Sequence, residues 1–294
     1  SHWIRCYRQV TNNSPSPSFV AIGHLSFDVN IVDNGPPSHH TPGGAAAYAA
    51  LTARKHGFST GILTAVDQDY PVREVLAGID VRVTESEHTS TFANYYDSGE
   101  RSQVLLASGN KIPQVSLPES WTQPDILFAG PLLHELPTDC VSWFNSGLSC
   151  LIPSGWLRRW GPDGVITHGN SLPSSLAGGR KWNVVVTSES EVQDLPERQL
   201  FDLGEIICIT RGALGARIWQ SGTWLEAPAI SASPVDVTGA GDIWATAFVI
   251  ALNERNHLED AARYAAGAAA VAIESEGMTG CPSREEITAR LDRN

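Results

Sequence analysis

Short apolar runs that are almost free of polar residues constrain the fold of this chain more than any other feature. The runs have the length of β-strands, and apolar and polar residues do not alternate within them. Strands of a parallel sheet that is covered on both faces have this composition. Helical stretches lie between several runs, so we expect a doubly wound, mostly parallel α/β sheet with helices on both faces. The predicted strands are residues 18–23, 60–66, 125–130, 149–153, 183–187, 205–210 and 216–219.

Four stretches are predicted to be helices. Residues 43–56 open with a glycine pair and end before Gly57, a residue type that is common just after a helix. A second helix is expected to begin near Gly241, and the alanine-rich residues 262–273 form a third. The last helix opens at Ser283, where the spacing to Glu286 predicts a capping box.

A small antiparallel sheet is predicted beside the main one. Residues 91–96 and 103–107 flank a short turn segment that contains glycine, and residues 27–32 would supply a partner strand. Such a sheet, formed from about residues 26–34 and 88–108, would be a lid that excludes water from a reacting site. A plain surface hairpin is the alternative. An uncovered edge of this sheet would also allow two subunits to pair as a homodimer.

Length and composition fit one domain with this small flap. The chain has 294 residues, of which 42% are hydrophobic; residues 1–18 resemble a flexible N-terminal extension, and 19–294 form the domain. No apolar stretch is long enough to cross a membrane. The net charge of −12 argues against nucleic-acid partners but does not exclude a phosphate ligand, which backbone amides can hold. Five cysteines without a Cys-x-x-Cys motif indicate a reducing cytoplasm, with Cys150 and Cys208 buried.

The segment from Asp236 to Asp242, with the sequence Asp-Val-Thr-Gly-Ala-Gly-Asp, carries the most chemical information. The first turn of a helix has unpaired N–H groups and a positive dipole end, and small residues let a phosphate approach them closely. Gly239, Ala240 and Gly241 would then form an anion hole for a transferring phosphoryl group. Asp242 beside it could accept a proton from a substrate hydroxyl. The alternative is a tight turn followed by an acid that the helix dipole favours.

This string resembles the signature of the ribokinase-like (PfkB) carbohydrate kinases, in which Asp-Thr-x-Gly-Ala-Gly-Asp supplies the anion hole and the base. Val237 stands at the second position here. The resemblance spans about residues 19–292 and implies ATP-dependent transfer of a phosphoryl group to a hydroxyl of a sugar or polyol. It makes Asp242 the catalytic base and implies Mg²⁺ as a cofactor. Some relatives also bind K⁺ next to this motif, which leaves a monovalent cation near Asp236 as an open alternative.

On the acceptor side, the resemblance assigns substrate hydroxyls to Asp28, which follows the first strand and its Gly. The alternative for Asp28 is a solvated turn residue. The pair Gly43 and Gly44 matches the glycines that open a substrate-binding helix in the family. Relatives usually carry a sugar-contacting Asn where this chain has Tyr48, and this departure argues against an ordinary ribose or fructose pocket.

On the donor side, relatives carry Asn-x-x-Glu after a strand, and the Glu organises Mg²⁺ through water. Ser188 replaces the Asn here, while Glu191 keeps its place; the alternative for Glu191 is an acid in the first turn of a helix. The resemblance also assigns the nucleotide phosphates to a Thr-x-Gly-x-x-Gly stretch and to the motif itself. These donor-side candidates are Ser188, Thr210, Gly212, Gly215 and Thr238.

Residues 152–160 follow a central strand where relatives often carry an Asp-x-Asn-x-Arg type of string. This chain has neither Asp nor Asn there, but Arg158 or Arg159 could face the cleft and neutralise phosphate charge. Alternatively, both arginines lie on the surface and Trp156 and Trp160 pack the loop. The string Gly-Trp-Leu-Arg-Arg-Trp is similar to that of the inositol-kinase-like branch, and Arg158 is taken as the candidate.

Phe92 and Tyr96 on the predicted lid are expected to contact the acceptor. Other catalytic classes are not supported: the chain has no Gly-x4-Gly-Lys-Ser/Thr loop, no Gly-x-Ser-x-Gly elbow and no metal-ligand spacing among its histidines. A second class of function stays open, namely a catalytically weak relative that binds a ligand or regulates. The departures at Tyr48 and Ser188 favour it, and the intact Gly239–Asp242 segment argues against it.

Overall fold

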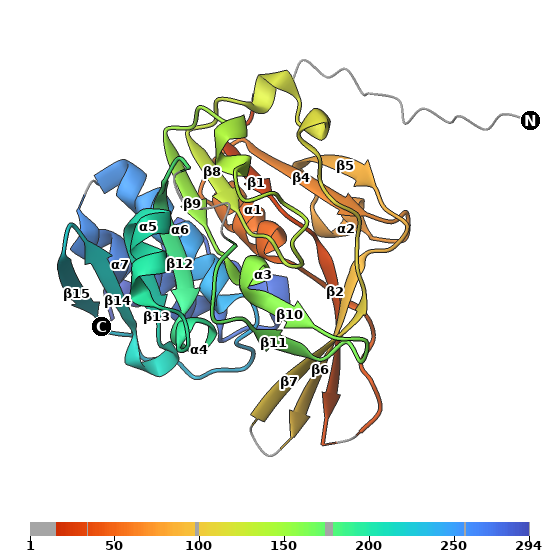
Figure 1. The fold of residues 1–294 in the computed structure, drawn as a ribbon. Coiled ribbons are helices and arrows are strands. Elements are labelled where there is room, and N and C mark those ends of the chain that lie inside the picture. Colours follow the sequence, from red (N-terminus) through yellow and green to blue (C-terminus); the bar gives the residue numbers. More distant parts are fainter. Residues whose placement is uncertain (1–15, 34, 98–99, 174–178, 256, 294) are drawn as a thin grey trace, which may run out of the picture.

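The computed structural model describes residues 16–33, 35–97, 100–173, 179–255 and 257–293 (Figure 1). Within these ranges, nine strands form the main sheet. The strands from β13 to β5 run parallel to one another, while β14 and β15 pair antiparallel at one edge. Their spatial order is β15 (Thr223–Ala227), β14 (Ala216–Gln220), β13 (Gly204–Thr210), β12 (Trp182–Ser188), β9 (Leu148–Leu151), β8 (Ile126–Ala129), β1 (Phe19–Ile22), β4 (Thr60–Val66) and β5 (Asp80–Glu85).

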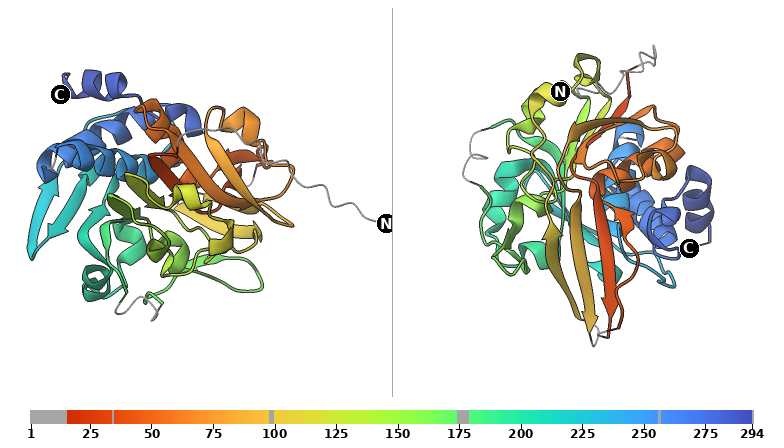
Figure 2. Two further views of the ribbon diagram at one scale, coloured as in Figure 1. Left: turned by 90° about the horizontal axis from the view of Figure 1, so that it is seen from above. Right: turned by 90° about the vertical axis from the view of Figure 1, so that its right-hand side faces the viewer.

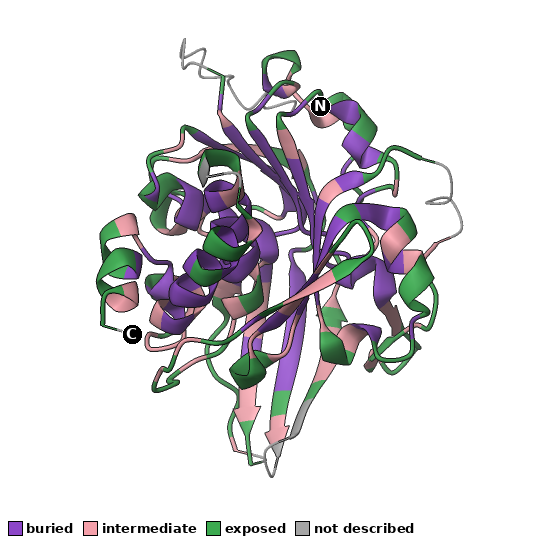
Figure 3. Cartoon of the chain, turned by 90° about the vertical axis from the view of Figure 1, so that its left-hand side faces the viewer, coloured by how far each residue is buried: buried purple, intermediate pink, exposed green. Residues whose placement is uncertain are grey.

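The two faces of the main sheet are covered differently. On one face, the helices α1 (Ala45–Lys55), α6 (Ala240–Arg255) and α7 (Leu258–Ala272) pack on the strands, and α8 (Arg284–Leu291) packs on α7. On the other face the helices are short, and Trp121, Trp143, Trp156 and Trp182 fill the core beneath them. Figure 3 shows the strands as a buried layer between the two covers. The predicted α/β sheet with helices on both faces is therefore confirmed.

The shorter elements lie in the connections between strands. The helices are α2 (Val72–Val75), α3 (Ser154–Leu157), α4 (Glu189–Val192) and α5 (Glu197–Leu203). The 3₁₀ turns are η1 (Gln114–Ser116), η2 (Glu119–Trp121), η3 (Cys140–Trp143), η5 (Gly212–Leu214) and η6 (Gly277–Gly280). No helix in the described ranges is long and apolar enough to cross a bilayer.

Two predicted helix ends have the expected geometry. Gly57 has a φ of 88°, a conformation that glycine adopts without strain, and the chain leaves α1 there through a bond from Phe58 N to Ala53 O of 3.1 Å. At α8, the Ser283 hydroxyl accepts from Glu286 N at 3.3 Å and the Glu286 carboxylate accepts from Ser283 N at 2.7 Å. This is the predicted capping box.

A separate small sheet, called the lid below, projects from one end of the main body (Figures 1 and 2). Its four strands have the order β3 (Thr41–Gly43), β2 (Ser26–Val32), β6 (Ser90–Asp97) and β7 (Glu100–Ala107). The predicted hairpin and partner strand are present, but the sheet is mixed because β2 runs parallel to β6. The purely antiparallel sheet was wrong, since the chain leaves β2 and passes through α1 and β4 before it returns.

A second hairpin, β10 (Arg158–Trp160) and β11 (Ile166–His168), lies against the outer edge of the lid. Leu105 N donates to Gly164 O at 2.8 Å, and Val104 pairs with Val165. Part of the β7 edge is thus occupied by the chain itself. Pairing of two subunits through the lid stays a prediction.

The cysteines that the structure describes, Cys140, Cys150, Cys208 and Cys281, are buried free thiols. The predicted burial of Cys150 and Cys208 is confirmed. Cys6 and most of the predicted N-terminal extension lie outside the described residues. The division into an extension at 1–18 and one kinase domain at 19–294 therefore stays a prediction.

Candidate active site

The glycine turn lies where the chain enters α6. Gly239 has a φ of 76° and its carbonyl accepts from Ile243 N at 2.9 Å, so that Asp242 falls in the first turn of the helix. A Cβ placed on Gly241 would have no other atom within 4 Å. The turn therefore borders open space beside the first amide groups of α6. This is the geometry that an anion hole requires.

Asp242 is surrounded by charged side chains from three other segments. Burial, together with the negative charges of Glu191 and Asp28, raises the pKa of its carboxyl to about 7, although the positive charge of Arg158 acts to lower it. Asp28 comes from the lid strand β2, Arg158 from β10 and Glu191 from α4. The structure thus brings together four of the predicted site residues. A carboxyl that titrates near neutral pH suits a general base.

Glu191 forms the capping box of α4, as the alternative interpretation expected. Its Oε2 accepts from Ser188 N at 3.0 Å and from Ser188 Oγ at 2.9 Å. Burial alone would raise the pKa of Glu191, but hydrogen bonds from Ser154 and Ser188 and the charge of Arg158 outweigh it and lower the pKa. Glu191 is therefore ionised while Asp242 titrates, and the two interpretations of Glu191 are compatible.

The structure separates the two candidate arginines. Arg158 Nη1 donates to Leu132 O at 3.3 Å, and its guanidinium carbon lies 5.2 Å from the ring centroid of Phe92 on the lid. Arg159 instead donates to Trp156 O at 2.7 Å and to Ser171 O at 3.3 Å. Arg158 therefore faces Asp242 and the lid, whereas Arg159 fastens its own loop.

Gly43 and Gly44 shape the surroundings of Asp28. The Oδ2 atom of Asp28 lies 2.7 Å from the position that a Cβ on Gly43 would take, so that only glycine admits this carboxylate. Gly44 precedes α1 and has a φ of 107°. A Cβ placed on Gly44 would lie 2.7 Å from His24 O. Both glycines support the approach of the lid strand to α1. Their direct contact with the acceptor stays a prediction.

Tyr48 lies behind the glycine turn. Its side chain is 3% exposed, and its Cε1 lies 2.4 Å from the position of a Cβ on Gly239. Burial raises the pKa of its hydroxyl, and the charges of Asp242 and Asp236 act in the same direction. The aromatic ring thus supports the anion-hole turn from below. Contact of Tyr48 with the acceptor, as the family comparison of this position implied, stays a prediction.

Three of the donor-side candidates are glycines or lie in the motif. Thr238 is held by Asp236, whose carboxylate accepts from Thr238 N and from Gly277 N at 2.9 Å each, and its role toward a nucleotide stays a prediction. Gly212 has a φ of 54° and borders open space, as a phosphate-lining glycine would. Gly215 has a packing role, since a Cβ there would lie 2.1 Å from Ala227 O.

The other two donor-side candidates have contacts inside the protein. Thr210 Oγ1 donates to Thr187 O at 3.3 Å, which joins the ends of β13 and β12. Ser188 belongs to the capping box of α4. Their roles toward a nucleotide stay predictions.

The lid places Phe92 and Tyr96 on one face of β6, since they are separated by an even number of residues. Phe92 is 2% exposed and lies against Arg158, and Tyr96 is half-buried. The sequence analysis missed the amides Asn30, Asn94 and Gln103 on this same face. Their only sequence signal is a polar residue recurring at every second position of strands with apolar neighbours.

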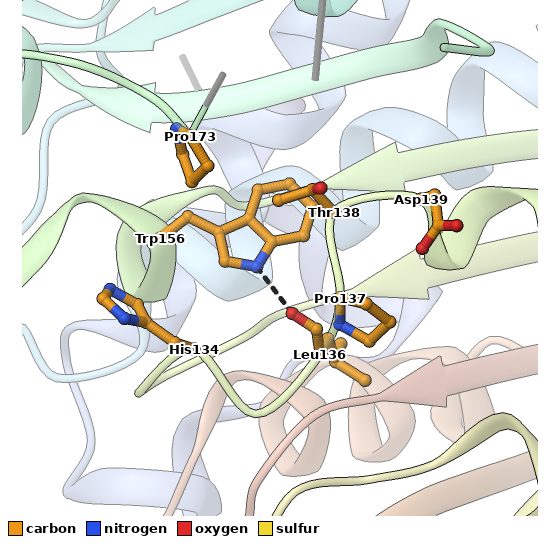
Figure 4. Close-up of a pocket in the computed structure, with 7 residues that line it drawn as sticks. All are labelled: His134, Leu136, Pro137, Thr138, Asp139, Trp156 and Pro173. Atoms are coloured by element: carbon orange, nitrogen blue, oxygen red, sulfur yellow. Dashed lines mark hydrogen bonds between the residues drawn. The ribbon is translucent and has the colours of Figure 1, made fainter. Parts of the chain in front are cut away.

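An open cavity of about 470 Å³ lies apart from these residues (Figure 4). It is lined by His134, Leu136, Pro137, Thr138, Asp139, Trp156 and Pro173. The Trp156 indole donates to Leu136 O at 3.0 Å and forms its floor. None of the lining residues is a predicted site residue.

Comparison with known proteins identifies the family. Residues 182–285 match the family described as pfkB family carbohydrate kinase, and this segment contains the whole of the Asp236–Asp242 motif. The chain belongs to the PfkB family of carbohydrate kinases. As a PfkB family member it is a phosphotransferase that acts on an alcohol group. The predicted family and enzyme class are thereby confirmed.

Among curated proteins, this PfkB chain is 23% identical over 262 residues to the cytidine kinase of Thermococcus kodakarensis, which covers 83% of this chain and 91% of that protein. It is 39% identical over 84 residues to the ribokinase of Bacillus subtilis, covering 28% of this chain and 29% of that protein. Among solved structures, it is similar to a pyrophosphate-dependent kinase in the ribokinase family complexed with a pyrophosphate analogue and myo-inositol. The TM-score is 0.78 at 20% identity, over 92% of this chain and 99% of that one.

A ribokinase from Arabidopsis thaliana complexed with ribose and ATP has a TM-score of 0.68 at 18% identity, over 94% of this chain and 99% of that one. At these identities the solved structures show the fold, which is ribokinase-like. They differ in donor and in acceptor, so neither follows from the likeness.

Proposed function

We propose that this PfkB chain transfers the γ-phosphoryl group of ATP to a hydroxyl of an inositol-like polyol or a sugar. One observation carries the proposal. A carboxyl with a pKa of about 7, that of Asp242, stands directly after an open glycine turn at the start of α6, and Asp28 and Arg158 face it. The base, the anion hole and a group that can hold a hydroxyl therefore meet in one place.

The proposed reaction uses these residues as follows. Asp28 holds the acceptor, and Asp242 takes the proton of the reacting hydroxyl as its oxygen attacks the γ-phosphorus. The bond from that phosphorus to the bridging oxygen breaks, and its electron pair leaves with ADP. The amides of Gly239, Ala240 and Gly241 stabilise the charge on the transferring group, and Arg158 neutralises part of it.

The donor is the less constrained half of the proposal. Leu214, Val235 and Val237 are 70%, 63% and 65% exposed, and they belong to the segments that carry the donor-side candidates. Exposed apolar side chains at this place have a reason if a nucleotide base covers them. Pyrophosphate is the second candidate, because structures of a pyrophosphate-dependent kinase have a TM-score of 0.78 with this chain. Pyrophosphate would need no such apolar surface.

The metal proposal is consistent with the side chains at the site. Among the described residues, no group of three or more His, Cys, Asp or Glu side chains could hold a metal ion. Mg²⁺ in kinases is usually held by substrate phosphates with one or two carboxylates, so Glu191 would be a sufficient protein partner. When bound, Mg²⁺ would neutralise the donor phosphates. Binding of a K⁺ ion near Asp236 is likewise a proposal.

A ligand-binding or regulatory role is the second candidate function, and it rests on the departures at Tyr48 and Ser188. The experiment incubates the purified chain with ATP or pyrophosphate, Mg²⁺, and each of myo-inositol, ribose and cytidine. Phosphorus NMR then identifies any phosphorylated product. Donor binding without transfer to any of the three acceptors would favour the regulatory role. Homodimer formation and a cytoplasmic location are further proposals, which light scattering and cell fractionation would test.

A further inference from the structure

Four polar side chains form a continuous hydrogen-bonded ladder across the lid. Asn94 Nδ2 on β6 donates to Asp28 Oδ1 at 2.9 Å and to Asn30 Oδ1 at 3.0 Å, both on β2. From the other side, Gln103 Nε2 on β7 donates to Asn94 Oδ1 at 2.8 Å. The ladder therefore spans three neighbouring strands. Asn94 lies at its centre and is 2% exposed.

The Asp28 carboxylate fixes the direction of every hydrogen bond in this ladder. An ionised carboxylate only accepts, so Asn94 must turn its NH₂ group toward Asp28 and its carbonyl toward Gln103. Gln103 must then donate inward and present its own carbonyl outward. Asn30 accepts from the second N–H of Asn94 and presents its NH₂ group outward. The ladder thus presents outward one donor, the NH₂ group of Asn30, and one acceptor, the carbonyl of Gln103. The negative charge of Asp28 sets the orientation of both through Asn94.

Neither of these two outward groups has a use among the residues that the structure describes. Across the described part of the chain, Asn30 Nδ2 and Gln103 Oε1 have no hydrogen-bond partner, and neither atom is sealed from solvent. A hydroxyl is both donor and acceptor, so the hydroxyl groups of a ligand would satisfy both Asn30 and Gln103. A phosphate, which only accepts, or an apolar ring would satisfy one or neither.

The ladder faces the candidate active site. In the strand register, Asp28 pairs with Phe92 and Phe92 with Leu105, while Asn30 pairs with Asn94 and Asn94 with Gln103. All of these side chains lie on one face of the lid, because they are separated by two residues along each strand. Phe92 on this face lies against Arg158, and Asp28 acts on Asp242. Asn30 and Gln103 therefore lie two residues farther along the strands from Asp242 than Asp28 does, a distance of roughly 7 Å.

We propose that Asn30 and Gln103, oriented by Asn94 and Asp28, form a hydroxyl-binding subsite that determines acceptor specificity. The acceptor is then an uncharged, hydroxyl-rich molecule with a second hydroxyl several ångströms from the one that is phosphorylated. This inference rests on the proposed function, since it assigns the far end of the same acceptor site. A site built to hydrogen-bond a hydroxyl strongly rejects analogues that lack it.

The test measures acceptor binding separately from turnover. Isothermal titration calorimetry is carried out with myo-inositol, with a set of deoxy-inositols that each lack one hydroxyl, with ribose and with cytidine. The variants are Gln103→Met and Asn30→Leu, which keep side-chain size and remove the amides. Gln220→Met, an exposed glutamine at the end of β14, is the matched control. Urea unfolding confirms that each variant is folded.

The subsite predicts that the wild-type chain binds myo-inositol or ribose and that each ladder variant weakens this binding about tenfold, the loss of one hydrogen bond. At least one deoxy-inositol should bind the wild-type chain more weakly than myo-inositol does. For the ladder variants, this deoxy-inositol and myo-inositol should have equal dissociation constants. Unchanged dissociation constants in both variants would overturn the subsite, as would a wild-type chain that binds cytidine alone or none of these ligands. Ladder-dependent binding without phosphate transfer would instead refute the proposed kinase reaction and leave the subsite standing.

Discussion

Asp242→Asn is expected to stabilise this protein and to inactivate it at the same time. Burial and the neighbouring carboxylates raise the pKa of Asp242 from 3.8 to about 7, so the folded chain resists its ionisation. A rise of this size corresponds to roughly 4 kcal/mol. Because the side chain is only half-buried, solvent reduces the expected gain to roughly 1–3 kcal/mol. Asparagine keeps the size of the side chain and cannot ionise.

The pH dependence follows from the sign of the shift. The folded-state pKa is raised, so the stabilising contribution of the protonated carboxyl is complete below about pH 4 and is lost as pH rises to about 7. The variant should therefore match the wild-type chain at pH 4 and exceed it increasingly up to pH 7. Urea unfolding between pH 4 and pH 8.5 measures this difference. Over the same range, wild-type turnover should rise with pH and level off above about 7, because the base must be ionised.

A matched control separates this effect from that of the helix dipole. Asp260 also lies in the first turn of a helix, α7, but it is exposed. Asp260→Asn should lower the free energy of unfolding by ~0.3–1 kcal/mol, a change of the opposite sign. Asp242→Asn should lower kcat by ~10²–10⁴ while donor affinity changes far less. The reasoning fails if Asp242→Asn is no more stable than wild type at pH 7.5, or if it turns over at a near-normal rate.

Three further experiments test the remaining parts of the site. Gly241→Ala should leave the free energy of unfolding unchanged or raise it by up to ~1 kcal/mol, because the new Cβ meets no protein atom. The same variant should lower turnover at least tenfold, and unaltered steady-state kinetics would contradict the anion hole. Glu191→Gln should move the pH–rate profile to lower pH, since Glu191 raises the pKa of Asp242, and should raise the Mg²⁺ concentration needed for half-maximal rate; identical profiles would remove Glu191 from the site. In a double-mutant cycle of urea unfolding, the effects of Gly239→Ala and Tyr48→Ala on the free energy of unfolding should be coupled by ~0.5–3 kcal/mol, because the ring of Tyr48 occupies the space of the new methyl group. Additive effects would argue against that contact.

Helices and strands could be predicted from the sequence where the local pattern of apolar residues matches the burial of the element in the fold. Every residue of β4 is buried, and its apolar run gave the strand with the observed bounds. The edge strand β5 was missed, because none of its residues is fully buried and the run is broken by charged side chains. The β10–β11 hairpin was also missed, since its two strands have three residues each and it lies against β7 of the lid. Contacts of this kind are not encoded in a local pattern.

The candidate site shows the same division. Asp242 and its glycine turn lie within a few consecutive residues, so the motif alone predicted their proximity. The choice of Arg158 over Arg159 came from the family resemblance, because neighbouring side chains of a strand point to opposite faces and the sequence does not say which face meets the cleft. The amide ladder joins residues that are 64 positions apart along the chain. Its existence depends on the register between β2 and β6, which no single segment specifies.

The hairpin that begins with Arg158 also ties the arginine to the lid. The bond from Leu105 N to Gly164 O fastens the lid edge to the turn of this hairpin, and Phe92 lies against the guanidinium group at its first residue. The hairpin β10–β11 lies beside the lid (Figure 1), so a closing movement of the lid would carry the positive charge with it. In the proposed reaction, Arg158 would therefore move with the lid toward the phosphoryl group, and it would withdraw with the lid when the product leaves.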